Sequence, residues 1–308
     1  MIKRIVVTII WCWPGILLSQ YERPGSSSAE FLNIGINARA EAMAGAYVSI
    51  ADGGAELVHY NVAALARLRR TSVSFSHTDW FADMNHEFLS VALPMGANST
   101  AAFTITAFQT DEMIVRTPLQ PDGTGETFYA GSYRFGIALA RNLTDHVAVG
   151  VMATYIRVSL HQDFSQDGVA GNFAVLYDTG VRNFRFGFQL SNFGSEIKFV
   201  NEAYPMPTNF SFGLSANAVE FADQALLVSV SAIKRNDGSP RGTIGGEYNY
   251  RDFVFLRAGY NIDDPVRSLA LGAGLKFSLG SHGLNVDYSY NEFDLLGGAQ
   301  RMSIGFQF

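Results

Sequence analysis

The chain ends with Arg301-Met302-Ser303-Ile304-Gly305-Phe306-Gln307-Phe308, and this octapeptide decides the fold. Side chains of a β-strand point alternately to its two faces. The even-numbered residues here are all apolar and the odd-numbered ones are polar or small, so one face is oily and the other is wet. Chain ends usually fray in water. A final aromatic on an apolar strand face therefore indicates that the last strand is paired and that this face meets lipid.

The same alternation recurs from about residue 72 onward in segments of roughly ten residues. Examples of the apolar sets are Leu89, Val91 and Leu93; Phe184, Phe186, Phe188 and Leu190; and Leu284, Val286, Tyr288 and Tyr290. The positions between them are polar or small and include Gly272, Gly274 and Gly305, as expected for the crowded inside of a curved wall. In a soluble sandwich the apolar faces would meet in a core, so alternation alone leaves that alternative open.

The connections between these segments differ in length. Short ones fall near 95–98 and 279–282, whereas longer ones cover 111–127 and 191–208. Short turns on one side and longer external loops on the other are typical of outer-membrane barrels. We therefore predict an all-β fold, a transmembrane antiparallel β-barrel of about fourteen strands over residues 71–308 with an N-terminal plug. Its expected location is the outer membrane of a Gram-negative cell, where it contacts outer-membrane lipid.

The composition agrees with a membrane barrel. Hydrophobic residues make up 48% of the 308 residues and charged residues 16%, whereas an average soluble domain has roughly 25% charged residues. The net charge of −6 offers no basic face, which excludes nucleic acid as a partner. No pattern for a cofactor, such as a glycine-rich phosphate loop between a strand and a helix, is found.

The first residues have the pattern of a secretion signal. Lys3 and Arg4 precede an apolar run over residues 5–18, with a cleavage point expected near Ser19. The alternative is an uncleaved membrane helix, but the run is shorter than the ~20 residues that a span needs. Cys12 lies within this segment, so the mature chain has no cysteine for disulfides, thiol catalysis or metal binding. The expected domains are a signal peptide at 1–20, a hatch or plug at 21–70 and the barrel at 71–308.

Residues 31–68 depart from the strand pattern because they are rich in small side chains. A short helix is predicted over 38–46 and ends near Gly45, and a second is predicted over 62–68. A segment of this length with small residues fits inside a barrel as a plug. The alternative is a periplasmic extension.

The same segment carries an ordered set of short motifs: Phe31-Leu32, Ile34-Gly35, Ala38-Arg39-Ala40, Met43, Gly45-Ala46, Ala51-Asp52 and Asn61-Val62-Ala63-Ala64-Leu65. Together they resemble the N-terminal signature of the PorV/PorQ family, within the wider group of fatty-acid-transporter-like (FadL-like) outer-membrane barrels. The last motif departs from that signature because it lacks a proline and a glycine, which puts the bend of the hatch in doubt. Shorter resemblances continue at 77–83, 192–207 and 246–260.

The resemblance implies a fourteen-stranded barrel with an N-terminal hatch. It also implies, from the characterised members, work in the type IX protein secretion system, with a translocon and secreted cargo proteins as partners. The residues of this chain that match the hatch motif, for which we expect a structural role, are Gly35, Arg39, Gly45, Asp52 and Asn61. Bacterial outer-membrane barrels commonly end in an aromatic residue that the assembly machinery reads, and we assign this role to Phe308.

Five charged residues occupy polar positions of the predicted strands: Arg185, Glu247, Arg257, Lys276 and Asp287. We expect them to pair with one another and with the plug across the lumen, because buried charges need partners. The alternative is that Glu247 and Asp287 form an acid/base couple. Residues 77–86 hold two histidines and two aspartates, but we interpret them as an external hairpin tip. We expect neither a catalytic site nor a metal site, and therefore no enzyme.

The resemblance therefore implies a non-enzymatic barrel that holds or hands over proteins at the cell surface, and we expect the loops 111–127 and 191–208 to form the contact surface. The alternative is a FadL-like passive transporter of hydrophobic small molecules, which needs a continuous apolar pocket and an exit through the wall. A membrane-bound hydrolase is a third possibility, but it lacks a recognisable nucleophile.

Overall fold

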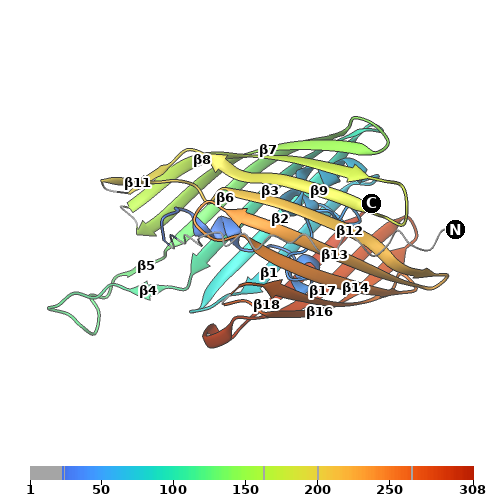
Figure 1. Ribbon diagram of the computed structural model, residues 1–308. Coiled ribbons are helices and arrows are strands. Elements are labelled where there is room, and N and C mark those ends of the chain that lie inside the picture. The colour runs from blue at the N-terminus through green and yellow to red at the C-terminus, as the bar shows by residue number, and fades with distance from the viewer. Residues whose placement is uncertain (1–22, 24, 162–163, 200, 265) are drawn as a thin grey trace, which may run out of the picture.

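The computed structural model describes residues 23, 25–161, 164–199, 201–264 and 266–308, so the expected signal peptide at 1–20 lies outside the described part. Within it, antiparallel strands hydrogen-bond to their neighbours in a complete circle (Figure 1). The predicted antiparallel barrel of fourteen strands is confirmed. The wall strands are β1 (Ser72–Asp79), β2 (Met84–Met95), β3 (Ser99–Thr110), β6 (Gly131–Asn142), β7 (Val147–His161), β8 (Phe164–Asp178), β9 (Arg185–Gly194), β12 (Asn209–Phe221), β13 (Gln224–Arg235), β14 (Arg241–Tyr250), β15 (Val254–Ile262), β16 (Leu269–Leu279), β17 (His282–Glu292) and β18 (Gly298–Gln307).

Strand β18 closes the barrel by pairing with β1. Eight residue pairs join the two strands, beginning with Ser72 opposite Gln307. Beyond the strand, the N–H of Phe308 donates to the carbonyl oxygen of Thr71 at 3.0 Å, and its ring lies 5.5 Å from the ring of Phe306. The final residue is therefore held by the first strand of the wall.

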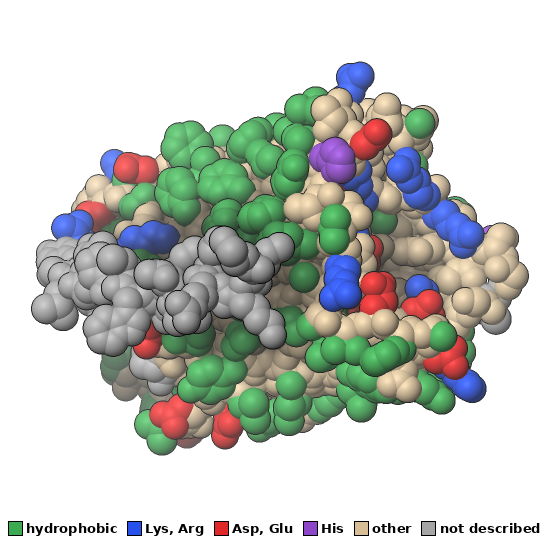
Figure 2. Space-filling view, turned by 45° about the vertical axis from the view of Figure 1, so that its right-hand side comes forward, with side chains coloured by type: hydrophobic (Ala, Val, Ile, Leu, Met, Phe, Trp, Pro, Cys, Tyr) green, Lys and Arg blue, Asp and Glu red, His purple; other side chains and the backbone are tan. Residues whose placement is uncertain are grey.

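The wall exposes its apolar face and buries its polar face. On β18, Met302 and Ile304 are 54% and 46% exposed, whereas Arg301 and Ser303 are each 2% exposed. Figure 2 shows hydrophobic side chains over the flank of the molecule. Because water does not favour an apolar belt of this extent, the belt requires acyl chains around it. The alternative of a soluble sandwich, in which these faces would meet in a core, is wrong.

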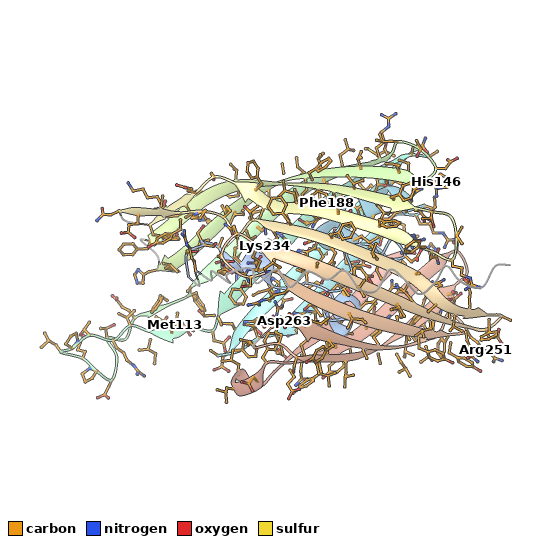
Figure 3. The ribbon with its side chains drawn as sticks, in the orientation of Figure 1. Met113, His146, Phe188, Lys234, Arg251 and Asp263 are labelled. Carbon is orange, nitrogen blue, oxygen red and sulfur yellow. The ribbon has the colours of Figure 1, made fainter. Side chains whose placement is uncertain are left out.

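The two ends of the barrel differ. In Figure 3, His146 and Arg251 mark the end with short turns, and Met113 marks the opposite end with long loops. The predicted long loops contain hairpins of their own. These are β4 (Met113–Ile114) with β5 (Thr127–Phe128), and β10 (Ile197–Phe199) with β11 (Glu202–Tyr204); a 3-10 turn, η3 (Asp294–Leu296), lies between β17 and β18.

Residues 29–68, called the lumen segment below, lie inside the barrel. Their elements are η1 (Glu30–Asn33), α1 (Ala38–Ala42), α2 (Leu57–Tyr60) and η2 (Val62–Arg67), where η denotes a 3-10 helix. Asn37 begins α1, because its Oδ1 accepts the N–H of Arg39 at 2.9 Å, the usual role of an N-cap residue. No helix in the described ranges has the length and apolar character that crossing a membrane requires.

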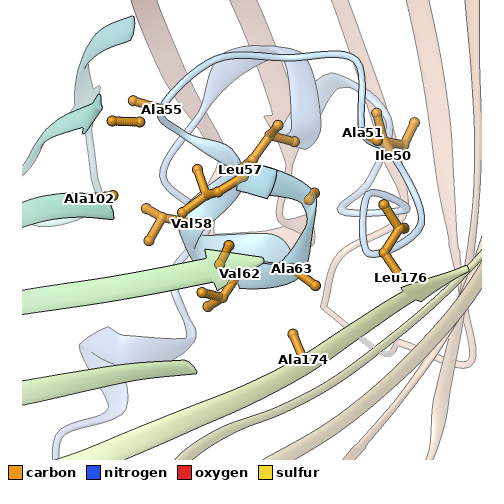
Figure 4. Close-up of a cluster of buried hydrophobic side chains, with 14 of the residues drawn as sticks. Ile50, Ala51, Ala55, Leu57, Val58, Val62, Ala63, Ala102, Ala174 and Leu176 are labelled. Carbon is orange, nitrogen blue, oxygen red and sulfur yellow. The ribbon is translucent and has the colours of Figure 1, made fainter. Parts of the chain in front are cut away.

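Small residues let the lumen segment touch the wall. Its apolar side chains Leu57, Val58 and Val62 are fully buried and pack in one cluster with wall alanines such as Ala102 and Ala174 (Figure 4). Burial of an aliphatic side chain stabilises a fold by about 1.5–3 kcal/mol.

Glycines of the wall allow a still closer approach. A Cβ atom on Gly187 of β9 would lie 2.0 Å from the carbonyl oxygen of Val48. A Cβ atom on Gly259 of β15 would lie 2.3 Å from the carbonyl carbon of Met43. At both places the backbone of the lumen segment rests directly on the wall, which only glycine permits.

Candidate functional site in the barrel lumen

The lumen segment separates two cavities. The inner cavity, about 790 Å³, lies toward the short turns and is lined by Arg39, Lys276 and the turn residue Asp223, among others. The outer cavity, about 130 Å³, lies toward the long loops and is lined by Leu32 and Arg267, among others. Within the described part of the chain, no residue lines both.

A chain of alternating charges fixes the lumen segment to the wall of the inner cavity. Arg39 of α1 donates from Nε and Nη2 to the two carboxylate oxygens of Glu247 on β14, both at 2.7 Å. Glu247 also accepts from Nε of Arg257 on β15 at 2.6 Å, and Nη1 of Arg257 donates to Asp287 on β17 at 2.6 Å. Bidentate geometry of this kind gives strong, directional ion pairs. Three wall strands thereby hold one short helix.

The structure therefore brings together three of the five predicted lumen charges, Glu247, Arg257 and Asp287. Both carboxylates are bound by arginine, so their geometry is that of ion-pair partners and does not favour the acid/base couple. Lys276 lines the same cavity and its backbone N–H donates to the carbonyl oxygen of Phe253 at 2.9 Å, but its side chain makes no ion pair or hydrogen bond with the described residues. Its prediction as a member of the network remains untested.

Arg185, the fifth predicted lumen charge, lies in a separate cluster. Its Nε donates to Asp178 at 2.7 Å and its Nη1 donates to Asp52 of the lumen segment at 2.6 Å. The carbonyl oxygen of Asp52 also accepts from Nη1 of Arg39. Asp52 thus links the two arginine clusters, although its side chain is 55% exposed, which weakens the pair through solvent screening.

The two motif glycines of the lumen segment have different roles. Gly45 has a φ of +74°, and its N–H donates to the carbonyl oxygen of Ala40 at 2.9 Å. It lies just after α1, where a left-handed glycine typically ends a helix. Gly35 leaves room for Glu41, because a Cβ atom there would lie 1.8 Å from Oε1 of Glu41 and would force that side chain to move.

The chain bends at Asn61, the first residue of the motif that lacks the proline and the glycine of the PorV/PorQ signature. Its Nδ2 donates to the carbonyl oxygens of Val48 at 2.6 Å and of Val175 at 3.3 Å, and its Oδ1 accepts the N–H of Ala63 at 3.0 Å. The residue is extended, with φ −157° and ψ 103°, and η2 begins directly after it. The side-chain bonds of one asparagine therefore turn the chain and attach it to β8.

A second set of buried polar side chains lies near the outer cavity, and it was not predicted from the sequence. Nη2 of Arg134 on β6 lies 3.1 Å from Nδ1 of His59, and Nη1 of Arg301 on β18 lies 4.0 Å from Oε2 of Glu41. Arg134 and Arg301 are 3% and 2% exposed. Both occupy inward-facing positions of strands in which polar and apolar residues alternate. This alternation in the sequence was sufficient to predict that they face the lumen.

Loop charges surround the mouth of the outer cavity. Asp264, in the loop after β15, accepts from Nη1 of Arg241 at 2.8 Å and from Nε of Arg267 at 3.2 Å. Burial raises the pKa of Asp264, but Arg267, the backbone N–H groups of Val266 and Arg267, and Arg241 together hold that pKa below its ordinary value. The carboxylate is therefore charged at neutral pH and ties the loop to the wall.

The wall ladder is interrupted between β8 and β9. Gly171 pairs with Phe193 and Phe173 pairs with Leu190, so the register shifts between these two pairs. Asn172, in the shift, accepts the N–H of Asn192 through Oδ1 at 2.8 Å. Asn192 has a φ of +58° and lies within the shift, and backbone pairing resumes at Phe193 and Gly194.

Apolar side chains fill the wall beyond this interruption. One buried cluster joins the lumen segment, β7, β8 and the β10–β11 hairpin: Phe31, Leu32, Ile156, Val158, Ala170, Ile197 and Met206. The outer part of β8 rests on this cluster, since a Cβ atom on Gly168 would lie 2.4 Å from Cε of Met206 and 3.1 Å from Cγ1 of Ile197.

The histidines of residues 77–86 lie on opposite faces of the wall. His86 is 1% exposed and faces the lumen, whereas the side chain of His77 is 41% exposed and contacts Asp79 and Glu87. They do not form one site. Among the described residues, no group of three or more His, Cys, Asp or Glu side chains is arranged to hold a metal ion.

Comparison with known proteins yields likeness in fold. No family model and no curated protein sequence matches the chain. Three similar solved structures are the deltaS2S3 mutant of the monoaromatic hydrocarbon channel TodX, with a TM-score of 0.61, the toluene transporter TbuX of Ralstonia pickettii, with 0.58, and the toluene transporter TodX of Pseudomonas putida, with 0.57. Each is 12% identical and covers 89% of this chain, and the alignments cover 98%, 98% and 96% of those chains. The chain therefore shares its barrel fold with these three channels and transporters.

Proposed function

We propose that this chain is a non-enzymatic outer-membrane barrel that conducts small hydrophobic molecules from the outside into the membrane. One observation carries the proposal: beside the lumen segment, an apolar cluster adjoins the register shift of the wall between β8 and β9. The similar barrels TodX and TbuX, described as a hydrocarbon channel and toluene transporters, support this function over a role in secretion.

The inner cavity is unsuited to an axial path for an apolar molecule. Such a molecule would lie against Arg39, Glu247 and Arg257 and would remove their water without offering hydrogen bonds in its place. The outer cavity also has charged lining residues, but the sideways path leaves it at Leu32, which belongs to the apolar cluster, and continues to the wall beside Asn172. A hydrophobic molecule then leaves into the acyl chains, where its free energy is lowest.

A disulfide across the interruption tests the sideways path. The variant carries Asn172→Cys and Asn192→Cys, and the mature chain is expected to have no other cysteine. In proteoliposomes we expect the reduced variant to take up labelled toluene like the wild-type protein. Oxidation should abolish most of this uptake, and reducing agent should restore it.

The matched control places a disulfide where the ladder is regular, at Ala102→Cys on β3 and Ala138→Cys on β6, which are direct partners. Oxidation of this pair should leave uptake unchanged. If wild-type vesicles take up no more toluene or labelled fatty acid than empty vesicles, transport is refuted. If both disulfides leave uptake intact, transport stands and the sideways path is wrong.

Protein secretion by the type IX system is the second candidate. The PorV/PorQ-like motifs of residues 31–68 favour it, and so does the arm formed by β4 and β5, which projects beyond the long-loop end (Figure 1). On this arm Leu119 is 93% exposed and Ile114 is 50% exposed. Leu119, exposed away from the wall among the polar residues of the arm, is suited to contact with a translocon or a cargo protein.

Deletion of residues 115–126, which leaves β4 and β5 in place, tests this candidate. We expect less type IX cargo in the medium if the arm binds the translocon or the cargo. Unchanged secretion in a strain that lacks the whole gene would remove the candidate.

A further inference from the structure

A buried layer of polar side chains, between the lumen segment and the wall, has more positive than negative charge. Arg301, Thr78 and His86 are neighbours in register across β18, β1 and β2. The layer continues through Thr106 of β3 to Arg134 of β6, whose Nη2 donates to the Thr106 hydroxyl at 3.1 Å. Five adjacent strands of the wall contribute to it.

The lumen segment closes the layer on its other side. Tyr60 Oη lies 3.5 Å from Oε1 of Glu41, Glu41 lies 4.0 Å from Arg301, and His59 lies 3.1 Å from Arg134. A guanidinium group only donates, so Nδ1 of His59 accepts and the ring is neutral. The layer thus contains two guanidinium groups and one carboxylate.

The layer also contains many polar atoms that lack a partner. In the described structure, no hydrogen bond reaches Nε of Arg134, Nε of Arg301, either ring nitrogen of His86, or the hydroxyls of Thr78 and Thr104, and all are buried. Each unpaired buried donor costs about 1–3 kcal/mol, and more when it is charged. Both arginines retain a free N–H, which any acceptor satisfies, and an acceptor with negative charge also balances the excess positive charge of the layer.

We propose that a small monovalent anion of the size of chloride binds in this layer, with Nε of Arg134 as its main donor. The outer cavity, about 130 Å³, is lined by both Arg134 and His59 and provides the route from the long-loop end. The anion supplies the missing negative charge and an acceptor for N–H groups. It also holds the guanidinium group of Arg134 in the position from which Nη2 donates to His59 of α2, and so stabilises the lumen segment in place.

Thermal unfolding of the purified barrel in detergent tests the site. Chloride is titrated against gluconate at constant ionic strength, because gluconate is too large for this layer. The wild-type protein should show a saturable rise in melting temperature of about 5 °C or more at a hundredfold excess over half-saturation. Arg134→Gln should lose this rise or need at least tenfold more chloride, whereas Arg141→Gln, exposed on the same strand, should behave as the wild type.

Crystals of the wild-type protein grown in bromide provide a second measurement that does not require the variant to fold. An anomalous peak within roughly 3.5 Å of Nε of Arg134 is expected. If the peak is absent, or if chloride and gluconate give the same melting temperature, the proposal is wrong and water satisfies these atoms. Neither measurement depends on transport. A negative result here would leave the proposed transport function standing, and a negative uptake test would leave the anion site standing.

Discussion

Replacing Glu247 with leucine should detach the lumen segment from the wall, because this carboxylate lies between two arginines. It accepts two hydrogen bonds from Arg39 and one from Arg257, all at 2.6–2.7 Å. After the replacement, Arg257 retains Asp287, but Arg39 retains only the carbonyl oxygen of Asp52. A guanidinium group then remains in the lumen with no counter-charge from the wall.

The expected loss follows from burial. Removing one partner of a buried ion pair costs about 3–5 kcal/mol in the free energy of unfolding, because the other charge stays behind. The side chains of Arg39 and Glu247 are 15% and 5% exposed, so solvent screens this pair little. The exposed pair Arg251–Asp223, with side chains 62% and 59% exposed, is a matched control whose loss should cost about 0.2–1 kcal/mol.

Urea unfolding from lipid vesicles, followed by tryptophan fluorescence, measures both losses. We expect Glu247→Leu to lower the free energy of unfolding by about 3–5 kcal/mol and Arg251→Met by less than about 1 kcal/mol. The double variant Arg39→Met with Glu247→Leu removes both charges, and should be less destabilised than the sum of the two single variants. Equal losses for Glu247→Leu and Arg251→Met would refute the reasoning.

Three further predictions concern other parts of the barrel. Acid should release the loop after β15, because the depressed pKa of Asp264 gives stabilisation that is present above its ordinary value of ~3.9 and lost as the pH falls through the lower folded-state value; weaker protection of the loop amides below pH ~4, measured against the exchange of unstructured peptide at the same pH, would confirm it, and unchanged protection would contradict it. Gly187→Val should destabilise the barrel by at least about 3 kcal/mol, since its Cβ would lie 2.0 Å from the oxygen of Val48, whereas Gly246→Ala, with its closest atom at 3.8 Å, should cost less in the same urea unfolding. Deletion of Phe308 should lower the yield of assembled barrel in cells more than the melting temperature of the protein that does fold; equal yields would remove its role as an assembly signal.

The strands of the wall were predictable because the alternation of polar and apolar residues is a local feature of the sequence. A period of two residues fixes which side chains face lipid, and this rule places Met302 outside and Arg301 inside without knowledge of any contact. Gly45 could likewise be expected to end α1, since a left-handed residue is needed there.

The pairing of charges was not predictable from the same rule. Whether a side chain faces the lumen depends on its own strand alone. Its ion-pair partner depends on the register between neighbouring strands and on the position of the lumen segment. Glu247 and Arg257 are direct partners across β14 and β15, whereas Lys276 faces Asn285 across β16 and β17. Arg185 pairs with Asp52 because the lumen segment passes beside β9, which no spacing in the sequence reveals.

The attachment of the lumen segment also limits how molecules pass the barrel. Axial passage requires the segment to move, and movement breaks the bidentate pair of Arg39, the bonds of Asn61 to Val48 and Val175, and the apolar packing of Leu57. The ion pair alone accounts for about 3–5 kcal/mol, and burial of one leucine for about 1.5–3 kcal/mol. At the register shift between β8 and β9, by contrast, Asn172 and Asn192 make side-chain hydrogen bonds within an otherwise paired ladder. Under the proposed sideways transport, a molecule leaves beside this shift, and the bonds that hold the lumen segment in the barrel stay intact.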